Sequence, residues 1–508
     1  MGQFDGFLIP FLNPSMIALV ALGVFSGLWV GAIPGLSVTM AASLLISFTF
    51  SWQLNNAMAL ICGIFVGGVY GGAITAILIN IPGAPAAIAT CFDGYPLAQR
   101  GEAGRTIGLV TTVSVFAGLL GVLVLMVAAP VVANFALQFA PRDYFLLALM
   151  GLLLIGSIGG GDPIKGVMAG AVGVLFSMVG MDPSTGEMRY TFDNVHLMAG
   201  ISFVTAMIGL FGVSEVLTQL RDLSQKTAKQ KLDKIIPDIK TFFKYLPLAL
   251  RSGLLGVWIG ALPGTGGDVA ALLAYDQAKR TVKHPSAPFG QGAIEGVIAP
   301  ESANKGAIGG AFIPMLTLGI PGDAVTAIII GAFFIHGLKP GPMLMVETPH
   351  IFWLIVSLLI LANIALLVIG LSSVRVFSKL VDVPKQIVMP LVIILSVVGT
   401  YAIQNSLGDI FWMIGFGVLG YFMRCYGFTT APMVLGIILG PLLDSNYRRA
   451  MQSAGDELVP FLMDFVTNPL TLFLTLAIVY LIISQTPWYL RMRGKAPKTV
   501  SDDGAEVS

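Results

Sequence analysis

The sequence has few charged residues and few residues of the kinds that hold metals or form disulfides. Of its 508 residues, 11% are charged and 56% are hydrophobic, whereas a soluble domain usually carries about 25% charged residues. The four histidines show no zinc or acid–base spacing, and Cys62, Cys91 and Cys425 stand singly in apolar surroundings, where we expect them to pack without disulfides. This composition argues against a soluble domain and predicts a polytopic membrane protein.

Other absences narrow the function. There is no G-x-x-x-x-G-K-[ST] phosphate loop, so ATP does not drive this chain directly. A net charge of +1 and the lack of basic runs among aromatics argue against a nucleic-acid partner. No alternation of period two is sustained, which favours helices over a β-barrel, and the N-terminus has no basic region that would indicate a removable signal peptide. We expect neither catalysis nor a cofactor.

One stretch of the first half returns nearly letter for letter in the second half. Residues 23–37 read GVFSGLWVGAIPGLS and residues 252–266 read SGLLGVWIGALPGTG, offset by 229 residues between Pro34 and Pro263. In both copies a small residue recurs at every fourth position, which lets another helix backbone approach closely. A Pro-Gly pair then ends the helix. The pattern predicts a duplicated protein with a broken helix in each half.

A second break is repeated as well. Gly71-Gly72-Ala73 leads to Ile81-Pro82-Gly83-Ala84, and Gly309-Gly310-Ala311 leads to Ile320-Pro321-Gly322-Asp323 with one extra residue between. We therefore predict an all-α polytopic membrane protein with about 10–14 membrane segments, in two repeats that each contain two Pro-Gly-interrupted helices. The predicted divisions are a first repeat at 1–220, a basic cytoplasmic linker at 221–245, a second repeat at 246–460, an additional membrane helix at 461–485 and a cytoplasmic tail at 486–508.

The distribution of basic residues predicts the orientation of the repeats. The linker and the tail are rich in Lys and Arg, which places both in the cytoplasm by the positive-inside rule. The flank after the first break, residues 51–56, has no basic residue, whereas the matching flank in the second half has Lys279, Arg280 and Lys283. Corresponding pieces then face opposite sides, which indicates an inverted-topology repeat, with a parallel repeat as the alternative. We also expect a hydrophilic turn over 93–105 and a single helix over 461–483.

The broken helices are the candidate binding site. Freed N–H groups at half-helix N-termini carry partial positive charge and bind anions. A break survives at membrane depth only if it is buried in protein or lines a water-filled cavity, so the alternative for any one break is a loop at the membrane surface. The candidate substrate-binding residues are Gly35, Leu36, Ser37, Asn80, Pro82, Gly83, Gly264, Thr265, Gly266, Gly267, Asn304, Lys305, Pro321 and Gly322.

Three polar residues beside the breaks are candidates for coupling to Na⁺ or H⁺, namely Asp268, Thr317 and Asp323. Intramembrane carboxylates are functional candidates because their burial is expensive. Asp268 could instead cap a helix over 269–279, an interpretation that we favour slightly. Lys305 and Glu301 stand four residues apart, so they could form an ordinary helix pair at a membrane surface.

The chain resembles the large membrane subunit of bacterial tripartite tricarboxylate transporters, the TctA family. The motifs that carry the resemblance are GLWVGAIPG at 27–35, INIPG at 79–83, GVWIGALPGTGG at 256–267 and PMLTLGIPG at 314–322. The resemblance implies a multi-pass permease of the bacterial inner membrane that works with a small TctB-like membrane subunit and a periplasmic TctC-like solute-binding protein. It also implies cation-coupled import of tricarboxylates or related organic acids by alternating access. The alternative is a stand-alone organic-anion channel or exporter.

Overall fold

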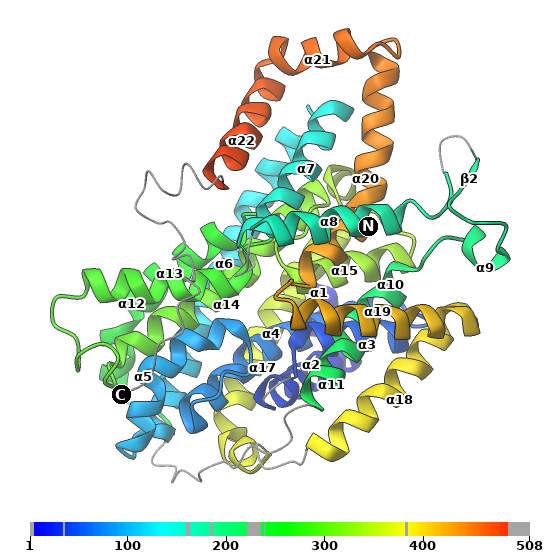
Figure 1. The fold of residues 1–508 in the computed structure, drawn as a ribbon. Helices are drawn as coiled ribbons and strands as arrows, with labels where there is room; N and C mark the ends of the chain where they lie inside the picture. Colours follow the sequence, from blue (N-terminus) through cyan, green and yellow to red (C-terminus); the bar gives the residue numbers. More distant parts are fainter. Residues whose placement is uncertain are drawn as a thin grey trace, which may run out of the picture.

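The computed structural model of the chain is a bundle of helices (Figure 1), and it describes residues 5–33, 36–158, 163–182, 186–220, 235–237, 239–380 and 385–485. Within these ranges the strands are β1 (Gly180–Met181) and β2 (Met188–Arg189), which pair as a short antiparallel hairpin. The predicted all-α membrane fold is confirmed. Within the described residues, four helices are long and apolar enough to cross a membrane, namely α2 (Pro14–Ala32), α4 (Leu54–Ile79), α6 (Ala103–Ala136) and α17 (Pro349–Leu380).

The number of membrane segments stays a prediction, because broken and short helices need not span alone. The pair α21 (Leu458–Thr467) and α22 (Pro469–Gln485) would make a fifth span, although it is bent by 94°. Several shorter apolar segments add to these in the described ranges, namely Val38–Thr49, Ile164–Ser177, Phe203–Gln219, Ala324–Ile335 and Met389–Ala402.

All four predicted breaks separate two helices. In the first half α2 is followed by α3 (Val38–Thr49), and α4 is followed by η1 (Pro85–Ala87) and α5 (Ile88–Gln99). In the second half α12 (Ile239–Gly260) is followed by α13 (Gly266–Thr281), and α14 (Glu295–Leu318) by α15 (Ala324–Ile335). Pro34 and Gly35 themselves lie outside the described residues.

The glycine stripes bring α2 against α4 and α12 against α14. A Cβ added at Gly27 would lie 2.5 Å from the carbonyl oxygen of Ile64, and one added at Gly71 would lie 2.5 Å from that of Leu28. In the second half a Cβ at Gly256 would lie 2.0 Å from the carbonyl oxygen of Ala303. Real Cβ atoms do not approach so closely, so each pair depends on glycine for its backbone contact.

These contacts fix the register of the duplication. Gly71 meets Leu28 and Ala32 as Gly310 meets Val257 and Ala261. The first helices of the two pairs therefore correspond at an offset of 229, and the second helices at 239 throughout, from Gly71 and Gly310 to the breaks at Gly83 and Gly322. The sequence-based alignment of Gly71 with Gly309, which needed one extra residue before the break, is wrong by one position. Gly71 corresponds to Gly310, and the sequence alone could not distinguish the two neighbouring glycines.

The long helix of each half packs against the other half. The first-half helix α6 lies against α12 and α14, whereas the second-half helix α17 lies against α2 and α4. The remaining helices also pack against helices of the other half. The span built from α10 (Phe203–Met207), η2 (Ile208–Val213) and α11 (Ser214–Gln219) packs against α18 (Lys385–Gln404) and α19 (Leu407–Cys425), and α20 (Ala431–Ser453) packs against α7 (Pro141–Ile158) and α8 (Pro163–Ser177).

Two local predictions are wrong. The expected turn over 93–105 is helical as far as Gln99, because Asp93 is fully buried and anchors α5 to the second half. The expected single helix over 461–483 is two helices, because Asn468 stops α21 and its side-chain oxygen accepts a hydrogen bond from the Leu470 amide of α22, at 3.1 Å. The tail at 486–508 and most of the linker at 221–245 lie outside the described residues.

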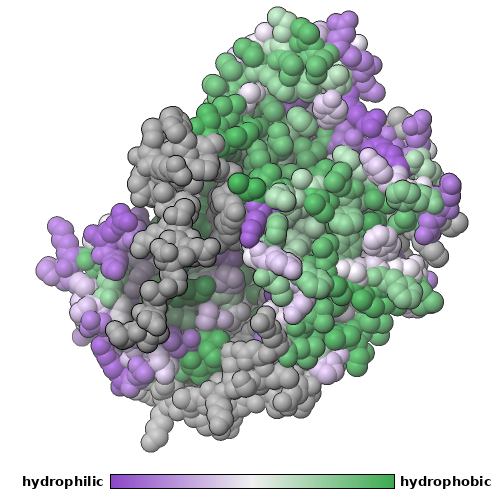
Figure 2. All heavy atoms as spheres, viewed as in Figure 1, coloured by the Kyte–Doolittle hydropathy of each residue, from purple (hydrophilic) through white to green (hydrophobic). Residues whose placement is uncertain are grey.

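The remaining short helices are α1 (Asp5–Leu12), α9 (Val195–Met198) and α16 (Pro342–Glu347). Of these, α1 packs against α17. Figure 2 shows hydrophobic side chains over much of one face of the molecule, across the region of α18, α19 and the α21–α22 pair. Hydrophilic residues gather at the left edge, beside α12 and α13, and at the upper right, near α20. Such a broad apolar surface suits contact with lipid.

Candidate functional site

The break between α12 and α13 presents an open helix N-terminus. Gly264 and Gly266 have φ angles of +78° and +57°, which L-residues rarely adopt. The Thr265 hydroxyl donates to the carbonyl oxygens of Ile259 and, at 3.0 Å, Leu262, so it caps the end of α12. The N-cap residue of α13, Thr265, makes no side-chain hydrogen bond to the first turn of α13. The leading amides of this helix are therefore available to an anion.

Asp268 joins this tip to the other half of the protein. Its Oδ1 accepts a hydrogen bond from the backbone amide of Ala86, at 3.0 Å, and Ala86 belongs to η1 after the second break of the first half. The helix α13 begins at Gly266, two residues before Asp268. The interpretation of Asp268 as the cap of a helix over 269–279 is therefore wrong: its carboxylate serves the opposing tip.

Asp323 and Asn304 approach the same tip. Asp323 caps α15 in a reciprocal capping box, in which Oδ1 accepts from the amide of Thr326 at 2.7 Å. A Cβ added at Gly266 would lie 2.9 Å from Cβ of Asp323, and one added at Gly267 would lie 2.0 Å from Oδ1 of Asn304. We call Ala86, Gly266, Gly267, Asp268, Asn304 and Asp323 the tip cluster. It combines three of the four breaks.

The tip cluster has a buried and a solvent-exposed part. Asn304 is buried, Asp323 is half-buried and Asp268 is exposed. The carboxylates of Asp268 and Asp323 are close enough to interact electrostatically. Two neighbouring carboxylates repel each other, so a cation or a proton between them is favourable. No group of three or more His, Cys, Asp or Glu side chains that could hold a metal occurs in the part of the chain that the structure describes.

The other predicted residues support the breaks. Ser37 caps α3 by accepting from the amide of Met40 at 3.1 Å, whereas Leu36 is buried and Gly35 lies outside the described residues. Asn80 ends α4 in the left-handed conformation at φ +57°. Gly319, which is equivalent to Asn80 in the second half, ends α14 in the same conformation, at φ +72°. The conformation is shared, although the residue type is not.

The Pro-Gly pairs of the second breaks fold back onto the glycine stripes. A Cβ on Gly83, which follows Pro82, would lie 2.1 Å from the carbonyl oxygen of Gly31, and one on Gly322 would lie 2.8 Å from that of Gly260. Pro321 and Gly322 are buried. The two breaks are thus held within the protein, which is what a break at membrane depth requires.

The side chains of Thr317 and Lys305 donate to backbone carbonyl oxygens outside the tip cluster. The Thr317 hydroxyl is buried and donates to the carbonyl oxygen of Ile313 at 2.7 Å, one turn before the break. The Lys305 ammonium donates to the carbonyl oxygen of Val66 on α4. Lys305 and Glu301 are each 1% exposed, so the interpretation of these residues as a pair at a membrane surface is wrong.

Sequence reasoning missed Asp93, which joins the two halves behind the site. Its Oδ1 accepts hydrogen bonds of 2.8 Å from the amides of Gly290, Gly292 and Ala293, and its Oδ2 accepts from the Tyr275 hydroxyl at 2.9 Å. The Asp-Gly-Tyr-Pro sequence around it is typical of a turn, so local composition concealed this role.

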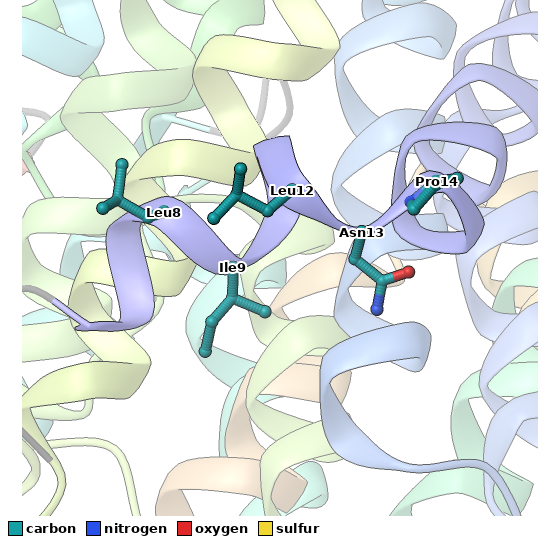
Figure 3. Close-up of a pocket in the computed structure, with 5 residues that line it drawn as sticks. All are labelled: Leu8, Ile9, Leu12, Asn13 and Pro14. Atoms are coloured by element: carbon teal, nitrogen blue, oxygen red, sulfur yellow. The ribbon is translucent and has the colours of Figure 1, made fainter.

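A shallow hollow lies elsewhere, at the corner between α1 and α2 (Figure 3). Leu8, Ile9, Leu12, Asn13 and Pro14 line it. Its one amide side chain, Asn13, already caps α2 by accepting from the amide of Ser15 at 3.0 Å. No predicted site residue lines this hollow, and its largely apolar wall does not suit a carboxylate.

The fold defines a multi-pass helical membrane protein, and the tip cluster gathers polar groups from three of its interrupted helices. The model of the tripartite tricarboxylate transporter TctA family matches residues 17–435. The chain belongs to this family, which is a family of transporter components.

Two relatives from Agrobacterium vitis are similar to the chain. One is described as an uncharacterized 52.8 kDa protein in the 3′ region of TAR-I ttuC′; it is 37% identical over 461 residues, which cover 90% of this chain and 91% of the relative. The other, an uncharacterized protein in the 3′ region of TAR-II ttuC′, is 40% identical over 234 residues, 46% of this chain and 94% of the relative. No solved structure matches the chain.

Proposed function

We propose that the chain is the large permease subunit of a binding-protein-dependent tripartite transporter of the bacterial inner membrane. It imports tricarboxylates or related organic acids together with Na⁺ or H⁺ by alternating access. A small TctB-like membrane subunit and a periplasmic TctC-like solute-binding protein are its partners. Membership of the TctA family supports the transporter class and, for the family in general, these partners.

One observation carries the substrate proposal: the uncapped N-terminus of α13 lies beside two carboxylates from different segments of the chain. The amides of its first turn can bind a substrate carboxylate. The side chains of Asp268 and Asp323 repel the same anion unless a cation occupies the space beside them. Cation and anion therefore bind best together, which is the thermodynamic requirement for symport.

The inverted relation of the two repeats is part of the proposal. Equivalent glycine contacts in α2–α4 and α12–α14, and the reciprocal packing of α6 and α17, support two structurally equivalent halves. In such transporters a module of broken helices rocks against the remaining spans around a site near the midplane.

The substitution Gly264→Ala tests the role of the α13 tip. Alanine at φ +78° is strained by about 1 kcal/mol or more, and the strain falls on the residues that aim the leading amides. We expect uptake of a radiolabelled tricarboxylate, by proteoliposomes that contain all three subunits, to fall at least about tenfold. Unchanged uptake would contradict the substrate role of this break.

Gly337→Ala is the matched control. Gly337 has a φ angle of +74°, it has no neighbouring atom within 4 Å of an added Cβ, and it lies outside the tip cluster. Gly337→Ala should destabilise the protein about as much as Gly264→Ala does, and it should leave uptake unchanged. Reconstitution without the solute-binding protein separates the alternative: undiminished uptake would favour a stand-alone channel or exporter.

A further inference from the structure

Two opposite charges are buried in the middle of α14. Glu301 and Lys305 are each 1% exposed. Because they stand four positions apart in α14, they lie on the same face of the helix. Removing a charge from water costs several kcal/mol even when a partner is present, and ionisable side chains inside membrane proteins mark pathways for ions or protons. Packing alone does not explain a Glu and a Lys here.

The two side chains have different hydrogen-bond partners. Oε1 of Glu301 accepts from the Thr90 hydroxyl of α5, whereas Oε2 has no hydrogen-bond partner among the described residues. The Lys305 ammonium donates to the Val66 carbonyl oxygen and lies 5.6 Å from the ring centroid of Tyr70. One buried carboxylate oxygen is therefore free to take a proton.

The surroundings of Glu301 contain few other titratable groups. Lys305 on its own helix, Tyr70 on α4 and Cys91 on α5 interact with it electrostatically. Asp93 of α5 lies farther along α14, against Gly296. From α13, Asp268 accepts from Ala86, and Tyr275 donates to Asp93. The helices α6 and α12 approach this part of α14 through glycines, namely Gly121 and Gly253 against Gly306, and Gly256 against Ala303.

The first half contains the same helix without the charges. At the offset of 239 set by the glycine contacts, Glu301 corresponds to Cys62 and Lys305 to Val66. The equivalent pair α2–α4 is built by the same backbone contacts with these apolar residues. The buried charges are thus unnecessary for the fold of the pair, and they are kept at a cost in only one half.

The charged pair flanks Asn304, the residue of α14 that belongs to the tip cluster. Asn304, which lies between Glu301 and Lys305 in sequence, reaches the backbone of Gly267 and donates to the carbonyl oxygen of Val69 at 3.4 Å. A change of charge at Glu301 or Lys305 is therefore felt at the amides that would hold the substrate, because charges interact strongly in a medium of low dielectric constant.

We propose that Glu301 is the residue that binds a coupling proton. When Glu301 is protonated it no longer neutralises Lys305, and the positive charge of Lys305 is then available to the substrate. This rests on the proposed function. A hydronium ion from one side of the membrane gives its proton to Oε2 of Glu301, so that an O–H bond of hydronium breaks, an O–H bond forms on Oε2 and water is released. The ammonium of Lys305 then attracts a substrate carboxylate. After the substrate leaves, Glu301 releases the proton to water on the other side and again neutralises Lys305.

A proton fits this position better than a metal cation. The ammonium of Lys305 repels a second cation on the same helix face. Na⁺ also requires several oxygen ligands, such as the unwound backbone carbonyls of broken helices, whereas Glu301 lies inside α14 and not at one of the breaks. The tip cluster, with its exposed backbone, is the better place for a metal.

The experiment compares Glu301→Gln with the unsubstituted transporter, both reconstituted with the two partner subunits. Radiolabelled di- and tricarboxylates are present on both sides of the membrane for exchange, or outside only with an imposed pH gradient for accumulation. We expect Glu301→Gln to keep exchange within about threefold, lose pH-driven accumulation at least about tenfold, and lose the pH dependence of exchange. A pH dye inside the vesicles should report proton entry with substrate for the unsubstituted protein alone.

Glu295→Gln is the matched control, because Glu295 is a buried carboxylate of the same helix whose oxygens accept from Ser286. It should lower stability and leave proton coupling intact. If Glu301→Gln is unstable, the double substitution Glu301→Gln with Lys305→Met, which removes both charges, should fold and lack coupling.

Three results would overturn the proposal: normal pH-driven accumulation by Glu301→Gln or by the double variant, a loss confined to Na⁺-driven accumulation, or substrate entry into unsubstituted vesicles without protons. Absence of any exchange by the unsubstituted transporter would instead contradict the proposed function itself.

Discussion

The α2–α4 pair of the first half and the α12–α14 pair of the second half are built by the same backbone contacts but carry different side chains. Gly27 approaches Ile64 as Gly256 approaches Ala303. At other equivalent positions the first half has Thr39, Ala84, Cys62 and Val66, where the second has Asp268, Asp323, Glu301 and Lys305. Small residues are thus what the architecture requires, and charge is an addition confined to one half.

The half-helices that follow the first breaks also differ. In the first half α3 lies against α4 and also against α15, α18 and η2, whereas in the second half α13 lies along α12 and α14 and meets η1. Both segments contact the long helices of their own half, but their further neighbours differ. The two halves are therefore not packed identically in this structure.

The largest expected effect tests the shared architecture. Gly27→Leu and Gly256→Leu should each destabilise the protein by about 3 kcal/mol or more, because the new side chain meets the backbone of the partner helix. Thermal unfolding in detergent measures this. Gly415→Leu, in a helix where an added Cβ meets nothing within 4 Å, is the control. Tolerance of one glycine substitution but not the other would show that the two pairs are not equivalent.

The next effect concerns the link between the halves. Asp93→Asn should cost about 2 kcal/mol, because the hydrogen bonds to an ionised group are the strong ones and Asp93 accepts four of them. Hydrogen exchange should increase at 286–294, before α14, and remain unchanged at the α2–α4 pair. Equal changes in both places would mean that the carboxylate has a global rather than a local role.

The charge at the tip is tested by a pair of equivalent substitutions. Asp268→Asn should reduce cation-dependent uptake of labelled tricarboxylate about tenfold or more, a typical size for coupling between two ligands. Thr39→Asn, at the corresponding position of α3, should change uptake less than about twofold. Similar losses in the two variants would argue that both halves bind the cation.

The smallest effect concerns the left-handed residues that end α4 and α14. Asn80→Gly should change stability by less than about 0.5 kcal/mol, since glycine adopts this conformation freely. Gly319→Asn should cost about 1 kcal/mol, because an added Cβ would lie 2.8 Å from the Pro340 carbonyl oxygen. Chemical denaturation in mixed micelles compares the two, and a larger loss for Asn80→Gly would reverse the comparison.

The sequence predicted the breaks and the close packing along the glycine stripes, because both depend on local chemistry, but it did not predict which helices pair. Pro-Gly ends a helix wherever it occurs, and a small residue at every fourth position leaves a stripe for close packing. The turn at 93–105 was mispredicted for the opposite reason. Asp93 and Pro96 favour a turn locally, but three amides far along the chain hold Asp93 within a helix.

The site was predicted in its parts and not in its assembly. Gly266, Asp268 and Asp323 were recognised as residues beside breaks, yet the partner of Asp268 is a backbone amide 182 residues away, in an alanine that carries no chemical signal. For Glu301 and Lys305 a pair at the membrane surface remained an alternative to a binding role, because opposite charges at four-residue spacing are common on exposed helix faces. Burial depends on the neighbouring helices, which spacing within one helix does not report.

The exchanged packing of the last spans constrains how the protein can be made. The span α10–η2–α11 packs against α18 and α19, which are synthesised after all the broken helices of the second half. Likewise, α7 and α8 pack against α20, which is synthesised later still. The amino-terminal portion therefore leaves the translocation channel with unmatched faces in the lipid. We infer that it is vulnerable to membrane proteases until synthesis is nearly complete, so that truncated chains should be degraded during biogenesis.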